Sequence, residues 1–279
     1  MGGGLPELRR LLATAGVSDP FWREVRKSKE APAQVRRALE RGADTVFVWG
    51  GDGMVQRSAD ALAGSGVALA VVPAGTANLF AANLGIPTDI EAAVAIGLHG
   101  ERRLLDMGRM NGERFAVMAG VGFDAMMIRD AGKGGLKERL GRAAYVWSGS
   151  GNLRVKPFRA RIEVDGGAWY KGDASCILVG NVGRLAGGVP VFADARPDDG
   201  ELDLGLVTAE GLLEWSRVLA RTALGKPTAS PFVRTTRVRS VKVKLKRKVL
   251  YELDGGERGK AKSFTVKVQP AALNVCVPS

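Results

Sequence analysis

The sequence predicts an α/β protein with two domains, and three observations support this prediction. Over about the first hundred residues, amphipathic helical patterns alternate with strands that are apolar throughout, which is typical of a parallel sheet covered on both faces. After Asp106, short β-like runs dominate instead, which favours a mainly antiparallel sandwich or distorted barrel. The chain has 279 residues, whereas one domain usually has roughly 100–150. We therefore expect a boundary near residues 105–110.

The elements of the first half follow from hydrophobic spacing and from glycine at their ends. Two strands, residues 44–49 and 67–72, are each followed by a turn that contains glycine and then by a helix. Helical spacing with a closing glycine or a following strand marks the other segments. The predicted helices are residues 5–15, 33–41, a segment ending at Leu62, a segment ending at Leu84, and 90–98.

The second half is predicted to consist of short strands separated by Gly, Asp and Pro turns. Two helical segments interrupt them, residues 136–147 and 212–224. The predicted strands are residues 114–119, 158–164, 174–179, 202–207, 238–245, 248–253 and 263–268.

Composition indicates a globular protein with a polyanionic partner. Hydrophobic residues make up 46% and charged residues 25% of the chain, and no apolar run approaches the ~20 residues needed to cross a bilayer. The Gly-rich start lacks the apolar core of a signal peptide, so we expect a cytoplasmic protein. The net charge of +12 points to an anionic lipid, a nucleic acid or a phosphorylated metabolite.

Part of this charge is local. Residues 234–248 alternate basic and apolar side chains, a period of two that predicts a strand with one basic face. That face is either an ordinary solvated surface or a membrane-docking surface. No aromatic residue interleaves with it, which argues against a single-stranded nucleic-acid platform.

The cysteines and the histidine narrow the possible chemistry. Cys176 and Cys276 lie far apart in apolar runs, so they are interpreted as reduced core residues rather than as a disulfide or metal ligands. His99 is the one histidine and is expected to be an exposed loop residue. A His-based triad and a zinc site are therefore not expected.

Two glycine-containing turns that follow strands carry the candidate chemistry. Gly50, Gly51, Asp52 and Gly53 join a buried strand to a helix, at the strand end where open α/β sheets bind ligands. Glycine lets the backbone approach a phosphate, and the helix N-terminus offers free amides. Asp52 would repel a phosphate but fits as a carboxylate that holds Mg²⁺, directly or through water.

The second turn, residues 73–78, also joins a strand to a helix. Thr76 could donate to a phosphate or serve as a helix N-cap. Asn78 could orient the loop or face solvent. Two adjacent loops of this kind could line one anion-binding crevice.

Taken together, these motifs resemble the catalytic domain of the diacylglycerol kinase family, which sphingosine and ceramide kinases share. The resemblance covers nearly the whole chain in order, and its segments are residues 50–53, 73–81, 84–87, 105–108, 119–125, 197–203 and 252–255. It implies an ATP- and Mg²⁺-dependent lipid kinase. It also implies a Rossmann-like N-terminal domain related to NAD kinases and phosphofructokinases over residues 1–107, without its usual first strand, and a C-terminal β-sandwich over residues 108–279.

The resemblance also implies roles for particular residues. Asp52 would stand near Mg²⁺ at the reacting phosphate, and Glu257 would be the general base, with Asp254 as the fallback. A structural Mg²⁺ would bind Asp199 and the main-chain carbonyls of Arg196 and Glu201, unless residues 198–200 form a simple hairpin turn. The nucleotide contacts would be Ser28, Gly50, Gly51, Asp52, Gly53, Met54, Gln56, Arg57, Gly75, Thr76, Asn78 and Asp106.

The sequence departs from the family pattern at three positions. Met54 and Leu79 stand where the family usually has Thr and Asp, and the extra Gly256 displaces Glu257 by one residue. Three functions stay open: a kinase for a diacylglycerol-like lipid hydroxyl, a catalytically impaired nucleotide- or lipid-binding relative, and an NAD-kinase-like enzyme. The expected partners are ATP, a lipid and the anionic inner face of the membrane, with no nucleic acid, and a homodimer is possible.

Overall fold

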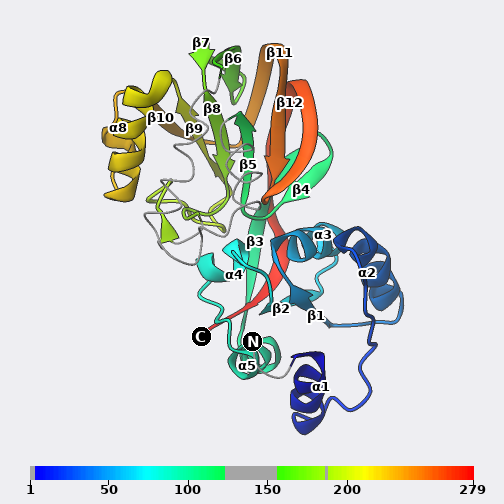
Figure 1. The fold of residues 1–279 in the computed structure, drawn as a ribbon. Coiled ribbons are helices and arrows are strands. Elements are labelled where there is room, and N and C mark those ends of the chain that lie inside the picture. Colours follow the sequence, from blue (N-terminus) through cyan, green and yellow to red (C-terminus); the bar gives the residue numbers. More distant parts are fainter. Residues whose placement is uncertain (1–3, 123–155, 186–187) are drawn as a thin grey trace. The chain divides into compact units, whose positions relative to one another are not determined.

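The computed structural model describes residues 4–122, 156–185 and 188–279, and Figure 1 shows its elements. The chain divides into two compact units, Met1–Leu105 with Ala271–Ser279, and Asp106–Pro270. The boundary expected after residue 107 placed the whole C-terminus in the second domain, whereas contacts place Ala271–Ser279 in the first unit. The helix predicted over residues 136–147 lies outside the described residues.

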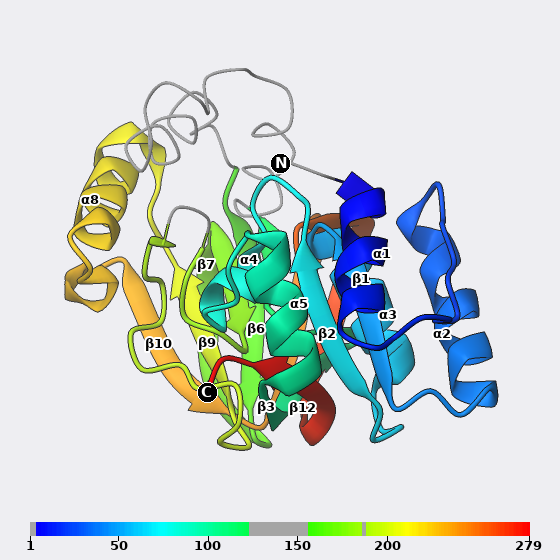
Figure 2. The same ribbon diagram turned by 90° about the horizontal axis from the view of Figure 1, so that it is seen from below.

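The first unit is built from a parallel sheet with helices around it. Strand β1 pairs in parallel with β2 from Thr45↔Ala68 to Gly50↔Pro73, and the end of β12 pairs in parallel with β2 at Asn274 and Val275. Helix α5 packs on β2, as Figure 2 shows. The elements are α1 (Gly4–Thr14), η1 (Ser28–Glu30), α2 (Ala31–Glu40), β1 (Thr45–Gly50), α3 (Asp52–Leu62), β2 (Ala68–Pro73), α4 (Leu79–Asn83) and α5 (Ile90–His99).

The parallel sheet predicted for this half is confirmed, and its apolar strands explain its core. Every residue of β2 is buried, as expected for a strand covered on both faces. Cys276 is buried and accepts a hydrogen bond at its Sγ from Nη1 of Arg102 at 2.6 Å. Both cysteines are free and buried, as predicted. His99 is exposed but ends α5 rather than lying in a loop.

One edge of this sheet is open. Among the described residues, β1 pairs with β2 alone. A cavity of about 710 Å³ lies along β1, and its lining includes the apolar side chains of Leu8, Leu12, Phe47 and Trp49. This explains why β1 is mostly half-buried although its sequence, like that of β2, is apolar.

The second unit is an antiparallel β structure, which confirms the β-sandwich prediction. Strands β5, β8, β9 and β10 pair in that order, and β11 pairs with β5, β6 and β12. The strands are β3 (Glu101–Met110), β4 (Glu113–Phe115), β5 (Met118–Gly122), β6 (Phe158–Val164), β7 (Gly167–Ala174), β8 (Cys176–Gly180), β9 (Leu202–Val207), β10 (Val233–Val238), β11 (Ser240–Leu253) and β12 (Gly256–Val277), with α8 (Gly211–Ala223) and η3 (Pro227–Ala229) between β9 and β10. In the described ranges, no helix is long and apolar enough to cross a membrane.

Several strand predictions need correction. The run 114–119 is split between β4 and β5, and the runs 238–245 and 248–253 belong to a single β11 that begins at Ser240. Three exposed basic residues, Lys246, Arg247 and Lys248, interrupt the alternation of β11 and resemble a turn. Strands β3 and β7 were not predicted, because each carries charged and glycine residues that are depleted in isolated strand patterns. Cross-strand pairing decides their structure instead. The strand predicted over residues 234–248 is divided at Arg239 between the end of β10 and the start of β11.

Candidate active site

The N-terminus of α3 forms the centre of the candidate site in the first unit. Strand β1 ends at Gly50, Gly51 is the N-cap in an extended conformation, and α3 begins at Asp52. The first amides of a helix have no intrahelical acceptor, and the helix dipole adds positive potential there. Strand, glycine turn and helix together form the geometry that binds phosphate groups.

Gly51 and Gly75 bring the two candidate loops into backbone contact. A methyl group on Gly75 would lie 2.5 Å from the Cα of Gly51 and 2.9 Å from Oδ1 of Asn78. A methyl group on Gly51 would lie 3.0 Å from the Cα of Gly75. Only glycine fits at Gly75 without a shift of the backbone, so the loops after β1 and β2 lie directly against each other.

Asn78 fixes the second loop. Its Oδ1 accepts from the Gly75 amide and its Nδ2 donates to the Gly75 carbonyl, both at 2.8 Å. Asn78 is buried and has φ 47°, a left-handed conformation that asparagine tolerates. Of the two roles considered for this residue, the structure supports loop orientation.

Asp52 connects the two loops. Its Oδ1 accepts from the amide of Phe80 at 3.3 Å, in the first turn of α4. Burial raises the pKa of this carboxyl, while hydrogen bonds from the amides of Phe80 and Leu79 oppose the rise. Asp52 therefore caps α4 from outside that helix, which could not be read from the sequence.

The remaining predicted nucleotide contacts differ in position. Ser28 lies beside the first turn of α3, because a methyl group on Gly53 would come within 3.9 Å of its Oγ. Thr76 is exposed and does not cap α4, whose N-cap is Asn78. Gln56 is only 2% exposed, so its side chain faces the interior.

Three other predicted nucleotide contacts, Met54, Arg57 and Asp106, lie in different surroundings. The β-carbon of Met54 packs against Gly50, where an added methyl group would lie 2.7 Å away. Arg57 is half-buried on α3. Asp106 lies in the second unit and is buried; its Oδ2 accepts from the amide of Gly200 at 2.6 Å.

Three carboxylates at and beside the turn between β11 and β12 have different surroundings: Glu252 in β11, Asp254 in the turn and Glu257 in β12. Asp254, buried and with φ 46°, accepts hydrogen bonds from the amides of Ala116, Val117 and Met118 at 2.8, 2.9 and 2.8 Å. Glu252 is 2% exposed and accepts from the Gly255 amide at 2.6 Å. Sequence reasoning assigned Glu252 no role. Glu257 is exposed.

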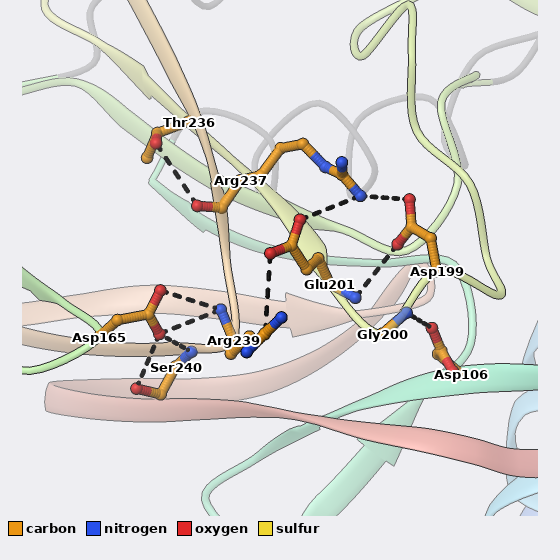
Figure 3. Close-up of polar contacts among 9 residues, drawn as sticks. All are labelled: Asp106, Asp165, Asp199, Gly200, Glu201, Thr236, Arg237, Arg239 and Ser240. Carbon is orange, nitrogen blue, oxygen red and sulfur yellow. Dashed lines mark hydrogen bonds and ion pairs between the residues drawn. The ribbon is translucent and has the colours of Figure 1, made fainter.

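The turn that was expected to hold a structural metal is occupied by an arginine, as Figure 3 shows. Arg237 forms an ion pair with Asp199 and a second one with Glu201 at 3.1 Å. Oδ1 of Asp199 also accepts from the Glu201 amide at 3.1 Å. Arg239 lies 3.7 Å from Glu201.

This arrangement does not fit a Mg²⁺ ion bound at Asp199. The guanidinium of Arg237 supplies the positive charge that the cation would supply, and both Asp199 oxygens have donors. In the described part of the chain, no group of at least three acidic, His or Cys side chains is placed to hold a metal. Burial raises the pKa of nearby Asp203 to about 6, and Arg237 opposes this rise. The chemistry of this turn therefore fits an arginine contact rather than a bound structural Mg²⁺ ion.

Comparison with known proteins identifies the family. The family model "Diacylglycerol kinase catalytic domain" matches residues 4–110, and the model "YegS C-terminal NAD kinase beta sandwich-like domain" matches residues 117–277. A protein of Klebsiella pneumoniae named "Probable lipid kinase YegS-like" is 31% identical over 99% of this chain and 93% of its own length. The chain belongs to the diacylglycerol kinase-like family of lipid kinases.

Another member of this lipid kinase family and two solved structures are also similar to the chain. A diacylglycerol kinase of Staphylococcus saprophyticus is 28% identical over 92% of this chain and 84% of its own length. A solved diacylglycerol kinase from Bacillus anthracis has a TM-score of 0.75 at 20% identity and covers 99% of this chain and 92% of its own. An NAD kinase from Archaeoglobus fulgidus, solved in complex with ATP, has a TM-score of 0.52 at 12% identity and covers 99% and 90%. These two structures show the shared fold alone.

The contact of Arg237 in this lipid kinase predicts how its β unit responds to metal. We expect Arg237→Met to lower Tm by a few degrees, because charge-assisted hydrogen bonds at a half-exposed site contribute about 1 kcal/mol. The wild-type Tm should be the same in Mg²⁺ as in EDTA. The Tm of the variant should be higher in Mg²⁺, because the substitution removes the guanidinium that pairs with Asp199. Thermal unfolding with and without Mg²⁺ measures both effects, with Arg239→Met as the control. A wild-type Tm that rises with Mg²⁺, and no longer does so in Asp199→Asn, would contradict this assignment.

Proposed function

We propose that this protein transfers the γ-phosphoryl group of MgATP to the hydroxyl of a diacylglycerol-like lipid at a membrane surface. The observation that carries the proposal is the close contact of Gly51 and Gly75, which joins two loops at the N-terminus of α3. Asn78 fixes this geometry through its two hydrogen bonds to Gly75. Membership of a lipid kinase family supports the choice of phosphoryl transfer over other uses of such a site.

The chain's own contribution to the reaction is positioning and charge stabilisation. Phosphoryl transfer needs donors already in place where negative charge develops. The amides at the start of α3 provide such donors, and the exposed Thr76 adds a hydroxyl from the second loop. The substrate MgATP brings its own Mg²⁺, which offsets phosphate charge. We assign Asp52 to the contact with that ion.

Glu257 is the proposed general base. A base must have an oxygen able to receive the acceptor proton. Both oxygens of Asp254 already accept backbone amides, whereas the side chain of Glu257 is exposed and its carboxylate has no hydrogen bond or ion pair to the described residues. This contrast favours Glu257 over the fallback Asp254.

The test is transfer of labelled phosphate from MgATP to mixed micelles that carry a panel of lipid hydroxyls. We expect product with the wild type and a decrease in kcat of about 10²–10⁴-fold in Glu257→Gln, because general-base catalysis contributes that much. Affinity for ATP should be unchanged in this variant. Glu40→Gln, which alters an exposed glutamate at the end of α2, is the matched control.

The other outcomes separate the remaining functions. Full activity in Glu257→Gln would assign the proton transfer to another group. ATP binding by a folded wild type that labels no lipid would favour the impaired binding protein. Transfer to NAD in a parallel assay, without lipid product, would favour the NAD-kinase-like enzyme.

A further inference from the structure

A row of like charges crosses three neighbouring strands of the second unit. Lys244 of β11 lies opposite Arg161 of β6, and Arg161 lies opposite Lys171 of β7. All three side chains are exposed. Neighbouring strands are about 4.8 Å apart, so three cations follow one another across the sheet at nearly that spacing. Figure 1 shows the three strands together.

The row continues along β11. Lys242 and Lys246 flank Lys244 at alternate positions and are exposed, while Val243 and Leu245 between them are buried. Alternation places the three lysines on one face. We call Arg161, Lys171, Lys242, Lys244 and Lys246 the basic face.

The fold does not neutralise this row as it neutralises its neighbours. On β6 and β7, two residues away from the pair of Arg161 and Lys171, Arg159 lies opposite Asp173. These two side chains form an ion pair at 3.1 Å. Glu163 lies opposite Lys242. Arg161, Lys171 and Lys244 form no ion pair with any described residue. Like charges directly opposite one another destabilise a sheet, so this row lowers the stability of the unit in isolation.

We propose that the basic face docks the protein on the anionic lipid surface in which its substrate resides. This rests on the proposed function, which requires contact with a membrane. The charge is complementary to such a surface, and binding there would relieve the repulsion within the row.

Nucleic acid is a poorer match for this face. The aromatic side chains of β7, Trp169 and Tyr170, are partly buried because they pack against the hydrophobic core, which leaves less of their surface for base stacking. The basic face instead presents long flexible cations on a β-sheet, which suits non-specific attraction to many headgroups.

The test is sedimentation with vesicles of phosphatidylglycerol and phosphatidylcholine, compared with vesicles of phosphatidylcholine alone. The triple variant Arg161→Gln, Lys171→Gln, Lys244→Gln removes the row. A Lys or Arg near an anionic surface contributes about fivefold to binding, so we expect this variant to bind anionic vesicles about 100-fold more weakly. The control Arg36→Gln, Arg217→Gln, Lys226→Gln removes the same charge from other exposed positions and should lose less than about threefold.

Two further measurements keep the outcome independent of folding and of catalysis. Tm of the row variant should equal or exceed that of the wild type, because in-register repulsion is removed. Phosphoryl transfer in neutral detergent micelles should be unchanged. If the wild-type protein bound anionic vesicles through the basic face but phosphorylated no lipid, this inference would hold and the proposed function would be wrong.

Three results would overturn the inference. Equal losses in the row variant and the control would show that only net charge matters. A decrease in Tm of several degrees would give the row a structural role. If the row variant lost binding to an RNA oligonucleotide but still bound vesicles like the wild type, the partner of the basic face would be a nucleic acid.

Discussion

Asp254→Ala should reduce the free energy of unfolding by about 3–5 kcal/mol, because it removes the carboxylate that satisfies three backbone amides. Those amides belong to Ala116, Val117 and Met118 and lie 2.8–2.9 Å from the Asp254 oxygens. A hydrogen bond to a charged group contributes about 1.5–3 kcal/mol, and a buried donor left unpaired costs about 1–3 kcal/mol. Alanine would also be strained at φ 46°. Chemical denaturation monitored by circular dichroism measures the change.

Two companion variants separate the causes. Asp254→Asn keeps the shape and tolerates the left-handed backbone, but its single acceptor oxygen cannot serve three amides, so we expect a loss of intermediate size. Asp19→Ala alters an exposed aspartate and should change stability by less than about 0.5 kcal/mol. If Asp254→Ala kept wild-type stability but lost kinase activity, Asp254 would be catalytic rather than structural.

The contrast between Asp52 and Asp254 shows how far sequence reasoning reached. The loop around Asp52 was predictable because its strand, glycines and helix are neighbours in the chain. The role of Asp254 was not, because the amides that it accepts lie 136–138 residues away. No local pattern reports such a contact.

The basic strand illustrates the same limit. The alternating charge of β11 was visible in the sequence. Whether acidic residues lie opposite its lysines depends on the register of β6 and β7, which the sequence does not show. Strand β7 itself was missed, because Gly167, Gly172 and Asp173 weaken its local pattern. The ion pairs that Arg237 makes with Asp199 and Glu201 likewise depend on β10 pairing with β9, so the expected metal site could not be judged from residues 196–201 alone.

Gly75→Ala should lower kcat/KM for MgATP by about 100-fold. The added methyl group would lie 2.5 Å from the Cα of Gly51 and 2.9 Å from Oδ1 of Asn78, which is closer than non-bonded atoms allow. Because one of these atoms is backbone, the two loops must separate by about an ångström, and a displacement of that size costs about 10²-fold in rate. Overpacking should also reduce stability by about 1–3 kcal/mol. Steady-state kinetics with varied MgATP measures the first effect and thermal unfolding the second.

Gly167→Ala is the matched control, because its methyl group would meet only the carbonyl oxygen of Val164, at 3.5 Å, an ordinary contact. It should leave both kinetics and Tm nearly unchanged. The loss in Gly75→Ala should appear in ATP affinity and turnover but not in the apparent KM for lipid, since the altered loops form the proposed phosphate site. Wild-type ATP affinity in a folded Gly75→Ala variant would mean that the phosphates bind elsewhere. The contact between Gly51 and Gly75 would then serve only the packing of the first unit.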